Sequence, residues 1–456
     1  MPFPKGFLWG AATSAYQIEG GHAQDGRGPS IYETFCARPG AVFMGQSGAV
    51  SADHYNRWRE DVGLMRDMSL RAYRFSLSWS RVLPDGTGGV NEAGIGFYDR
   101  LVDELLKAGI EPWITLFHWD LPLALHHRGG WFNRDIAQWM GEYARVVTDR
   151  LSDRVTHWMT INEPQVFIKH GYGDGAIAPG YKLSLAEQVQ TCHNSLRAHG
   201  LAAQSIRAAA KKPPQVGWAL VGRTDFPASE SPADIEAARA GTMAITQHDL
   251  WNNTWYADPA VFGHYPEDAL KLFGPDAQPP VQPGDMDLIR QPLDFYGLNI
   301  YDGRPMRAGQ GGKPELVPMP DGHPQTAIRW FMVPPALRWG PRFIYERYKI
   351  PVYITENGMS GIDWIMRDGR VHDPQRIDYT ARYLLELQKA IGDGADIRGY
   401  FHWSLLDNFE WSQGYKERFG LIYVDFATGQ RTPKDSAHWY KRVIETNGAS
   451  LNDAAL

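Results

Sequence analysis

Val352–Gly358, which reads VYITENG, has the pattern of a short buried strand that ends on a carboxylate. Its first four residues are β-branched or aromatic and favour extended backbone. Glu356 follows them, and the Asn-Gly pair after it is typical of a strand end. A second stretch, Thr156–Pro164 (THWMTINEP), ends in the same way on Glu163. Two apolar strands that each end on an acid predict a sheet whose strand ends carry the chemistry.

Strand-like stretches alternate with helical ones along the whole chain. Most are short apolar runs without polar alternation, as expected of parallel strands covered by helices. Eight alternations without a break in composition predict one α/β catalytic domain over residues 1–456, a (β/α)8 TIM barrel with long loops on its catalytic face. An open doubly wound sheet with an added domain is the alternative, although no dinucleotide fingerprint supports it. The expected strands are Phe7–Ala12, Ala72–Ser78, Glu111–Phe117, His157–Asn162, Gln215–Val221, Asp294–Ile300, Val352–Thr355 and Arg398–Trp403.

Several helices between these strands have clear sequence signals. Apolar residues recur at helical spacing over Phe97–Leu105. A capping box predicts a long helix over Ser184–Ala210, and an Asp-Pro start predicts another over Asp373–Gly392. The least regular segment is Asp302–Gln325, which is rich in Gly and Pro. It is interpreted either as a long loop on the catalytic face or as a disordered surface insertion.

The composition excludes several classes of function. The 456 residues carry a net charge of −6 and no basic run, so nucleic acid is not an expected partner. No apolar segment is long enough to span a membrane, and the N-terminus lacks a signal-peptide pattern, so a cytoplasmic protein is expected, although removal of a leader would leave the same sequence. No zinc spacing or phosphate loop occurs, so no metal or cofactor is expected. Cys36 and Cys192 are expected to be two buried free thiols. The oligomeric state is not predicted.

Aromatic residues are abundant, with 17 Trp, 21 Tyr and 19 Phe. Some of them fill the core. Others stand beside polar residues, as in Phe117–Asp120 (FHWD) and Phe401–Ser404 (FHWS). Such a mixture suits a ligand that has both C–H faces and hydroxyl groups, which indicates a sugar.

The strand ends supply the groups that a glycosidase needs. In a (β/α)8 barrel the C-terminal strand ends form the active site, and glycoside hydrolysis needs two carboxyl groups flanking the anomeric carbon. We expect Glu356 to be an ionised nucleophile stabilised by Arg74 and Tyr301, and Glu163 to be the acid/base, with a pKa raised by the neighbouring carboxylate. A retaining mechanism would place the two carboxyl groups about 5–5.5 Å apart. Other residues expected near this mouth are Gln17, Glu19, His118, Trp119, Asn162, Asn299, Trp403, Asp407, Asn408, Glu410 and Trp411.

Each of these residues also has an ordinary structural interpretation. Glu163 before Pro164 is typical of an acid that opens a helix, and Glu356 of a solvated strand end. An arginine such as Arg74 often forms a structural ion pair, and His118 fits a core histidine. No single spacing decides between these interpretations, but their joint placement at strand ends favours catalysis.

Seven segments, in order along nearly the whole chain, resemble glycoside hydrolase family one, the β-glucosidase family. They are FLWGAATSAYQIEGG, YRFSLSWSRVLP, TLFHWDLP, TINEP, YGLNIY, YITENG and FHWSLLDNFEW. The resemblance implies a retaining double displacement, with Glu163 as acid/base and Glu356 as nucleophile. It also implies a pocket for the non-reducing sugar, with Gln17 and Glu410 on the O3/O4 side, His118 and Trp411 near O3, Asn162 at the 2-hydroxyl and Trp403 under the ring. Phe419 would line this pocket, and Trp119, Asn299 and Tyr301 would complete it. Trp330 resembles the tryptophan on the aglycone side in this family.

Two residues, Glu410 and Glu163, narrow the substrate class that the resemblance implies, and two others depart from the family pattern. Relatives that cleave 6-phosphorylated sugars carry a small or hydroxyl residue at the position of Glu410, so unphosphorylated glycosides are expected. Thioglucosidases replace the acid/base by Gln, whereas this chain keeps Glu163, so O-glycosides are expected. Gln165 and Arg329 depart from the usual pattern and leave the aglycone preference open.

The expected activity is that of an exo-acting retaining β-glycosidase. A β-glucosidase is favoured, removing terminal non-reducing β-D-glucosyl residues from cellobiose, as in cellulose degradation, or from aryl and alkyl β-glucosides. One Gln and one Glu can pair with either C4 epimer, so side activity on β-galactosides and β-fucosides is also expected. Two alternatives remain, a transglycosylating β-glycosidase and a catalytically silent sugar-binding protein on the same barrel.

Overall fold

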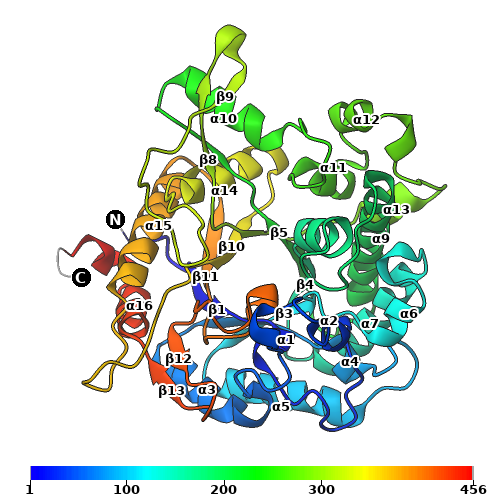
Figure 1. Ribbon diagram of the computed structural model, residues 1–456, viewed down its shortest axis with the longest axis vertical. Coiled ribbons are helices and arrows are strands. Elements are labelled where there is room, and N and C mark those ends of the chain that lie inside the picture. The colour runs from blue at the N-terminus through cyan, green and yellow to red at the C-terminus, as the bar shows by residue number, and fades with distance from the viewer. Residues whose placement is uncertain (1, 454–456) are drawn as a thin grey trace.

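Eight parallel strands form a closed barrel at the centre of the protein, which confirms the predicted fold (Figure 1). The computed structural model describes residues 2–453. Each observed strand begins and ends within two residues of its predicted stretch. In their order around the barrel the strands are β1 (Leu8–Ala12), β2 (Ala72–Ser76), β3 (Glu111–Phe117), β4 (His157–Asn162), β5 (Gln215–Val221), β7 (Tyr296–Asn299), β10 (Val352–Asn357) and β11 (Ile397–Trp403), which pairs with β1.

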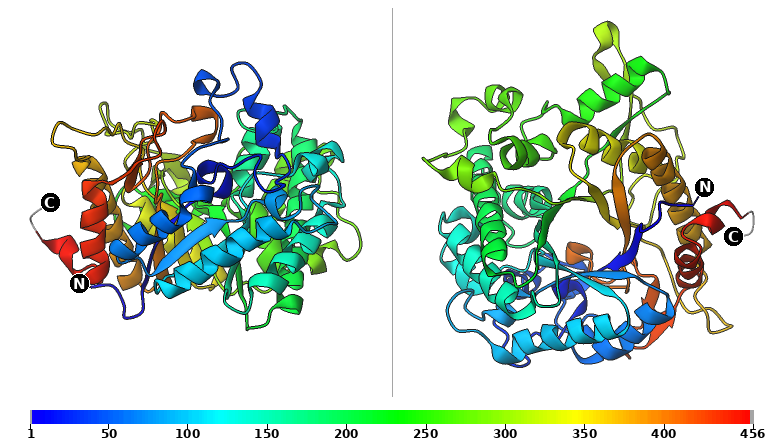
Figure 2. Two further views of the ribbon diagram at one scale, coloured as in Figure 1. Left: turned by 90° about the horizontal axis from the view of Figure 1, so that it is seen from below. Right: turned by 180° about the vertical axis from the view of Figure 1, so that it is seen from behind.

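Helices surround the barrel and cover the outer face of its strands (Figures 1 and 2). The predicted capping box is present, because the Ser184 hydroxyl accepts from the Glu187 amide and the Glu187 carboxylate accepts from the Ser184 amide. The longer helices are α3 (His54–Asp67), α5 (Glu92–Lys107), α7 (Ile136–Leu151), α9 (Leu185–Ala209), α10 (Pro232–Met243), α14 (Ala336–Tyr348), α15 (Pro374–Gly392) and α16 (Asp435–Glu445). Shorter ones are α1 (Ala15–Ile18), α2 (Ile31–Cys36), α4 (Trp79–Val82), α6 (Leu123–His127), α8 (Pro164–Val166), α11 (Thr254–Phe262), α12 (Glu267–Phe273) and α13 (Asp285–Ile289).

An aromatic layer fills the barrel interior. The Trp113 ring lies 5.2 Å from Phe295, 5.1 Å from Phe401 and 4.8 Å from Tyr353, measured between ring centroids. Small residues in the same cluster, among them Ala219, leave room for these rings. The barrel is therefore a packed core and not a channel, and part of the aromatic content serves packing as well as any ligand.

The irregular segment Asp302–Gln325 is partly ordered into strands. A three-stranded sheet joins β6 (Asp225–Pro227), β8 (Arg304–Ala308) and β9 (Pro314–Leu316), and it projects from the barrel (Figure 1). The first residues of the segment, Asp302–Arg304, line the cavity, so its predicted location on the catalytic face is confirmed. The disordered-insertion interpretation is wrong, because β8 pairs with strands on both sides. A second small sheet pairs β12 (Ile422–Val424) with β13 (Arg431–Pro433).

The two cysteines are both buried and free, as predicted. Among residues 2–453, no helix has the length and apolar character needed to cross a bilayer.

Candidate active site

The C-terminal ends of the barrel strands open into a cavity of about 530 Å³. Six predicted residues are buried and do not line it, namely Gln17, Glu19, Arg74, Asn162, Asp407 and Asn408. The predicted residues that line the cavity are His118, Trp119, Glu163, Asn299, Tyr301, Trp330, Glu356, Trp403, Glu410, Trp411 and Phe419.

Glu356 is the second-to-last residue of β10, where the strand is irregular. The register against β7 shifts between Ile354 and Glu356, and such an irregularity re-aims a side chain. Arg74 Nη1 donates to the Glu356 carboxylate at 2.5 Å, and the Tyr301 hydroxyl donates to it at 2.6 Å. Burial raises the pKa of Glu356, whereas Arg74, Tyr301 and Asn299 lower it by favouring the charged form. Glu356 is buried and ion-paired, so the solvated-strand-end interpretation is wrong.

Glu163 follows β4 and has a left-handed backbone, with φ 44°. It is the N-cap residue of α8, which begins at Pro164, so the predicted helix start is confirmed. Its side chain makes no capping hydrogen bond, however, and lines the cavity instead. Its carboxylate accepts one hydrogen bond from Asn299 Nδ2 at 3.0 Å. Burial raises the pKa of Glu163 well above its usual range, and the charge on Glu356 raises it further. The sequence predicted this direction from the neighbouring carboxylate, but burial is the larger cause.

The two carboxyl groups therefore differ in their readiness to ionise. Glu356 has a guanidinium and a phenol as donors, whereas Glu163 has a single amide. Because a charge-assisted hydrogen bond stabilises a carboxylate more than a neutral one does, the pKa of Glu163 lies above that of Glu356. Asn299 bonds Glu163 and also lowers the pKa of Glu356 by hydrogen bonding, so both acids lie against one amide. The expected separation of about 5–5.5 Å for a retaining pair stays a prediction.

Asn162 and Asn299 tie the two acids to Arg74. Arg74 Nη2 donates to Asn162 Oδ1 at 2.5 Å, and Asn299 Nδ2 lies 3.1 Å from the same oxygen. The Asn162 amide nitrogen lies 3.1 Å from His118 Nε2. Because Asn162 Oδ1 is held by donors, this nitrogen donates and the His118 Nε2 atom accepts. Burial, with the charge on Arg74, lowers the pKa of His118 well below its usual range, so the ring is neutral.

Glu410 and Gln17 close one end of the cavity. Gln17 Nε2 donates to Glu410 Oε2 at 3.2 Å and to Asn408 Oδ1 at 3.0 Å. The Ser14 hydroxyl donates to the side-chain oxygen Oε1 of Gln17 at 2.7 Å. Burial raises the pKa of Glu410 to about 8, and the charge on Glu356 contributes. The rings of Trp403 and Trp411 stack against the His118 ring at 5.7 and 6.1 Å. Polar groups and aromatic faces thus meet at this end, as a sugar site requires.

The other end of the cavity is open and includes residues that the sequence did not single out. Trp330 packs 5.1 Å from Tyr301 and lines the wall, as predicted. Gln165 does not face the cavity, because it is buried and bonds the backbone of Val221. Arg329 is exposed and is not part of the lining. Residues that line this end without having been predicted include Val166, Lys169, His170, Ile177, Val221, Arg223, Asp249, Trp251, Asp302, Arg304 and Gln413.

Glu19 shows that a buried acid with an arginine and a tyrosine is not by itself catalytic. Arg81 Nε donates to its carboxylate at 2.9 Å, and the Tyr98 hydroxyl donates at 2.6 Å. These partners match those of Glu356, but Glu19 does not line the cavity. Glu19 is therefore a structural counterpart of Glu356 within the same barrel.

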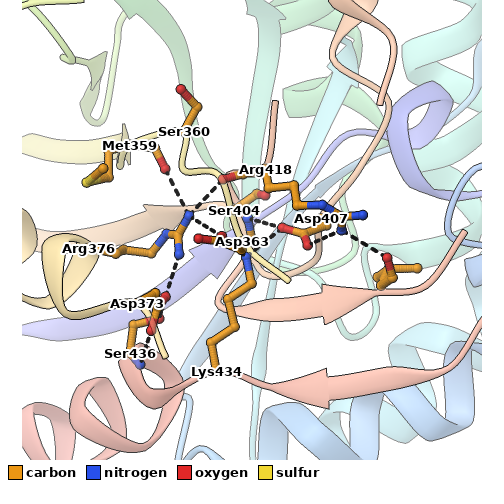
Figure 3. Close-up of polar contacts among 12 residues, drawn as sticks. Met359, Ser360, Asp363, Asp373, Arg376, Ser404, Asp407, Arg418, Lys434 and Ser436 are labelled. Atoms are coloured by element: carbon orange, nitrogen blue, oxygen red, sulfur yellow. Dashed lines mark hydrogen bonds and ion pairs between the residues drawn. The ribbon is translucent and has the colours of Figure 1, made fainter. Parts of the chain in front are cut away.

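A buried ion network behind the cavity holds the loops that follow β10 and β11 (Figure 3). Lys434 Nζ lies 2.6 Å from Asp363 and 2.8 Å from Asp407. Asp407 also accepts from Arg418 at 2.6 Å and from the Gly420 amide at 3.0 Å. Asp407, which was expected near the mouth, is therefore a structural ion-pair partner. Arg376 extends the network, pairing with Asp363 at 2.8 Å and with Asp373. The network joins the segments that carry Phe419 and Glu410.

We expect Lys434→Met to lower the free energy of unfolding by about 3–5 kcal/mol, because it removes the buried cation that Asp363 and Asp407 share and leaves each with a single arginine. Urea denaturation measures this change. Lys441→Met is the matched control, because Lys441 is partly exposed, pairs with Glu445 at 3.9 Å and should change stability by less than about 0.5 kcal/mol. Equal stability of the two variants would contradict a structural role for the network.

Among residues 2–453 no cluster of three or more His, Cys, Asp or Glu side chains is placed to hold a metal ion.

Comparison with known proteins places the chain among glycosidases. The family model described as Glycosyl hydrolase family 1 matches residues 1–449. The chain is 43% identical over 447 residues to β-glucosidase A of Thermotoga maritima, covering 98% of both chains. It is 44% identical to a 1,4-β-D-glucan glucohydrolase of Thermotoga neapolitana, covering 98% of this chain and 99% of the relative. The solved structure of the Thermotoga maritima β-glucosidase in complex with glucoimidazole superposes with a TM-score of 0.89 at 43% identity, over 98% of this chain and 99% of that one.

Proposed function

Since the chain belongs to glycosyl hydrolase family 1, we propose that its cavity releases the terminal, non-reducing β-D-glucosyl unit of cellobiose and of aryl or alkyl β-glucosides. The protein is a retaining O-glycosidase with β-glucosidase relatives over nearly its full length. The carrying observation is the pair of acids around Asn299. Arg74 and Tyr301 stabilise the charged form of Glu356 and oppose the effect of burial on its pKa, whereas burial raises the pKa of Glu163 well above its usual range.

The first step of the proposed reaction forms a glycosyl ester. A Glu356 carboxylate oxygen attacks the anomeric carbon while the bond to the aglycone oxygen breaks, and Glu163 gives its proton to that oxygen. The charge of Glu356 is consumed in the ester, so the largest charge that raises the pKa of Glu163 disappears. Glu163, now a carboxylate, takes a proton from water, whose oxygen attacks the anomeric carbon and releases Glu356. Two inversions give a β-configured product.

The sugar is proposed to sit between Glu410 and the acids. Glu410 and Gln17 would hold the O3/O4 side, His118 and Trp411 would lie near O3, and Asn162 would approach the 2-hydroxyl. Trp403 would lie under the ring, and Trp119, Asn299, Tyr301 and Phe419 would complete the walls. Closure of this end by Glu410 and the tryptophans supports exo action, because no further sugar fits beyond it. A carboxylate and an amide can bond either epimer at C4, which supports side activity on β-galactosides and β-fucosides.

A panel of 4-nitrophenyl β-glycosides tests the assignment. We expect activity on the glucoside, lower activity on the galactoside and fucoside, and a kcat/KM about 100-fold lower on the 6-phosphoglucoside, because a like charge against Glu410 costs several kcal/mol. The discrimination should grow from pH 7 to pH 9. The phosphate is already a dianion there, whereas Glu410, with a pKa of about 8, is still gaining its charge.

Proton NMR of the first product and the panel together separate the remaining alternatives. β-Glucose should appear before its anomer, and α-glucose first would contradict retention. Glucosyl transfer products at high substrate concentration would favour the transglycosylating alternative. Saturable binding of glucosides without turnover of any of them would establish the silent sugar-binding protein.

A further inference from the structure

Arg223 lies at the open end of the cavity, on the wall next to the acid/base. It follows β5 by two residues, and β5 is joined to Glu163 because the Glu163 amide donates to Ala219 O at 2.7 Å. Val221, Gly222 and Arg223 all line the cavity as the chain leaves the strand. Glu163 protonates the leaving oxygen in the proposed reaction, so the wall beyond it faces the aglycone.

The Arg223 guanidinium has unused donors. Its single hydrogen bond to a described residue is from Nη1 to the backbone oxygen of Trp251 at 2.9 Å, although a guanidinium carries five N–H donors. Within residues 2–453 no carboxylate lies within ion-pair distance of it. The nearby acids are engaged elsewhere, since Asp225 forms a two-point pair with Arg304 at 2.8 and 2.9 Å and Asp249 pairs with Lys169 at 3.2 Å.

The charges facing Arg223 leave one positive charge unmatched. Arg304 and Lys169 line the same end of the cavity, and each already has its acid. Asp302 is the remaining acid of this wall, and its carboxylate accepts from the adjacent Gly303 amide. Burial raises the pKa of Asp302, and burial together with Arg304 lowers the pKa of Arg223, although Asp225 and Asp249 oppose the second shift. Burial therefore disfavours the charged form of both groups.

The geometry points to Arg223 as the anion-binding residue of the aglycone site, selecting β-glucosides whose planar aglycone carries a carboxylate. This inference rests on the proposed function and adds the class of aglycone. A guanidinium holds a carboxylate in two-point fashion, and Arg is the side chain best suited to this geometry. Trp330 and Trp251 line the same end and give a flat aglycone apolar faces to pack on.

The test compares two pairs of isosteric substrates on the wild-type enzyme and on Arg223→Met. The substrates are the 3- and 4-carboxyphenyl β-glucosides and the corresponding carboxamides, which differ in charge but hardly in shape. We expect the ratio of kcat/KM for the carboxylate over that for the carboxamide to fall about tenfold in Arg223→Met. A tenfold change is at the lower end of the range of effects seen when a hydrogen bond between charged groups is lost. Arg329→Met, which removes an exposed arginine outside the lining, should leave this ratio unchanged.

Salt dependence gives a second measurement that needs no variant. Because Arg223 is only partly buried, the wild-type ratio should fall as ionic strength rises from about 0.05 to 0.5 M, since screening weakens the attraction. A ratio that is independent of salt and unchanged in Arg223→Met would overturn the inference. Equal losses on carboxylate and carboxamide would also overturn it, because Arg223 would then bond neutral aglycones. If the wild-type enzyme cleaves neither substrate nor the 4-nitrophenyl glucoside, the proposed function itself fails.

Discussion

Glu356→Gln lowers kcat/KM on aryl β-glucosides by about 10⁵-fold or more, the range seen when an enzyme loses its nucleophile. The amide cannot form the glycosyl ester, although it keeps the shape of the side chain and one acceptor oxygen for the two donors Arg74 and Tyr301. The measurement is steady-state release of 4-nitrophenol, with circular dichroism to confirm folding.

Glu19→Gln is the matched control for this loss. It removes the same charge from a pair with the same kinds of partners, at 2.9 Å from Arg81 and 2.6 Å from Tyr98, outside the cavity. We expect it to lower stability and to leave kcat/KM within about tenfold of wild type. Equal losses in the two variants would mean that Glu356 acts through the fold, and the nucleophile assignment would be wrong.

Azide distinguishes the nucleophile from any other essential acid. In Glu356→Ala the space left by the side chain admits a small anion, which attacks the anomeric carbon from the face that Glu356 occupied. With a 2,4-dinitrophenyl β-glucoside, azide should restore turnover and give the α-glucosyl azide by a single inversion. A β-azide would place the nucleophile elsewhere.

The barrel and the catalytic pair were predictable because both depend on local sequence. Short apolar runs such as Ile354 and its neighbours identify the strands, and the first polar residue after each run lies at the mouth. The strand positions also indicated Arg74, Tyr301 and Glu410, of which Tyr301 and Glu410 line the cavity and Arg74 bonds Glu356 from within β2. The prediction ended β10 two residues early, because Glu356 and Asn357 pair with neighbouring strands through shifted registers that tertiary contacts impose.

The aglycone end was not predictable to the same degree. Its residues come from long segments after β4 and β5, whose paths depend on packing between distant parts of the chain. The one local signal was Arg223, two residues past a predicted strand end, and the fifth strand was left without a candidate. The ion network could not be predicted from the sequence for the same reason, since Lys434 pairs with Asp363, which is 71 positions away.

The second prediction concerns the acid/base. Glu163→Gln lowers kcat/KM by about 10²–10⁴-fold on glucosides with poor leaving groups, such as phenyl β-glucoside, because no proton reaches the departing oxygen. On 2,4-dinitrophenyl β-glucoside the loss should be far smaller, since that oxygen leaves without a proton. Azide should then speed turnover and give the β-glucosyl azide, because it attacks the glycosyl ester that Glu356 still forms. A loss that does not vary with the leaving group would contradict the assignment.

The pH profile of kcat/KM tests the same residue independently. Activity should fall at low pH, because Glu356 becomes protonated, and at high pH, because Glu163 loses its proton. Burial and the charge on Glu356 raise the pKa of Glu163 and so move the second fall to higher pH. Glu410, with a pKa of about 8, is a second source for a fall at high pH. Two substrates and one variant separate these sources. If Glu163 is the source, the basic limb is present with phenyl β-glucoside, is weak with 2,4-dinitrophenyl β-glucoside, and persists on phenyl β-glucoside in Glu410→Gln. If the limb is equally strong with both substrates and disappears in Glu410→Gln, the limb reports sugar binding, and the proton donor must be established from the leaving-group dependence alone.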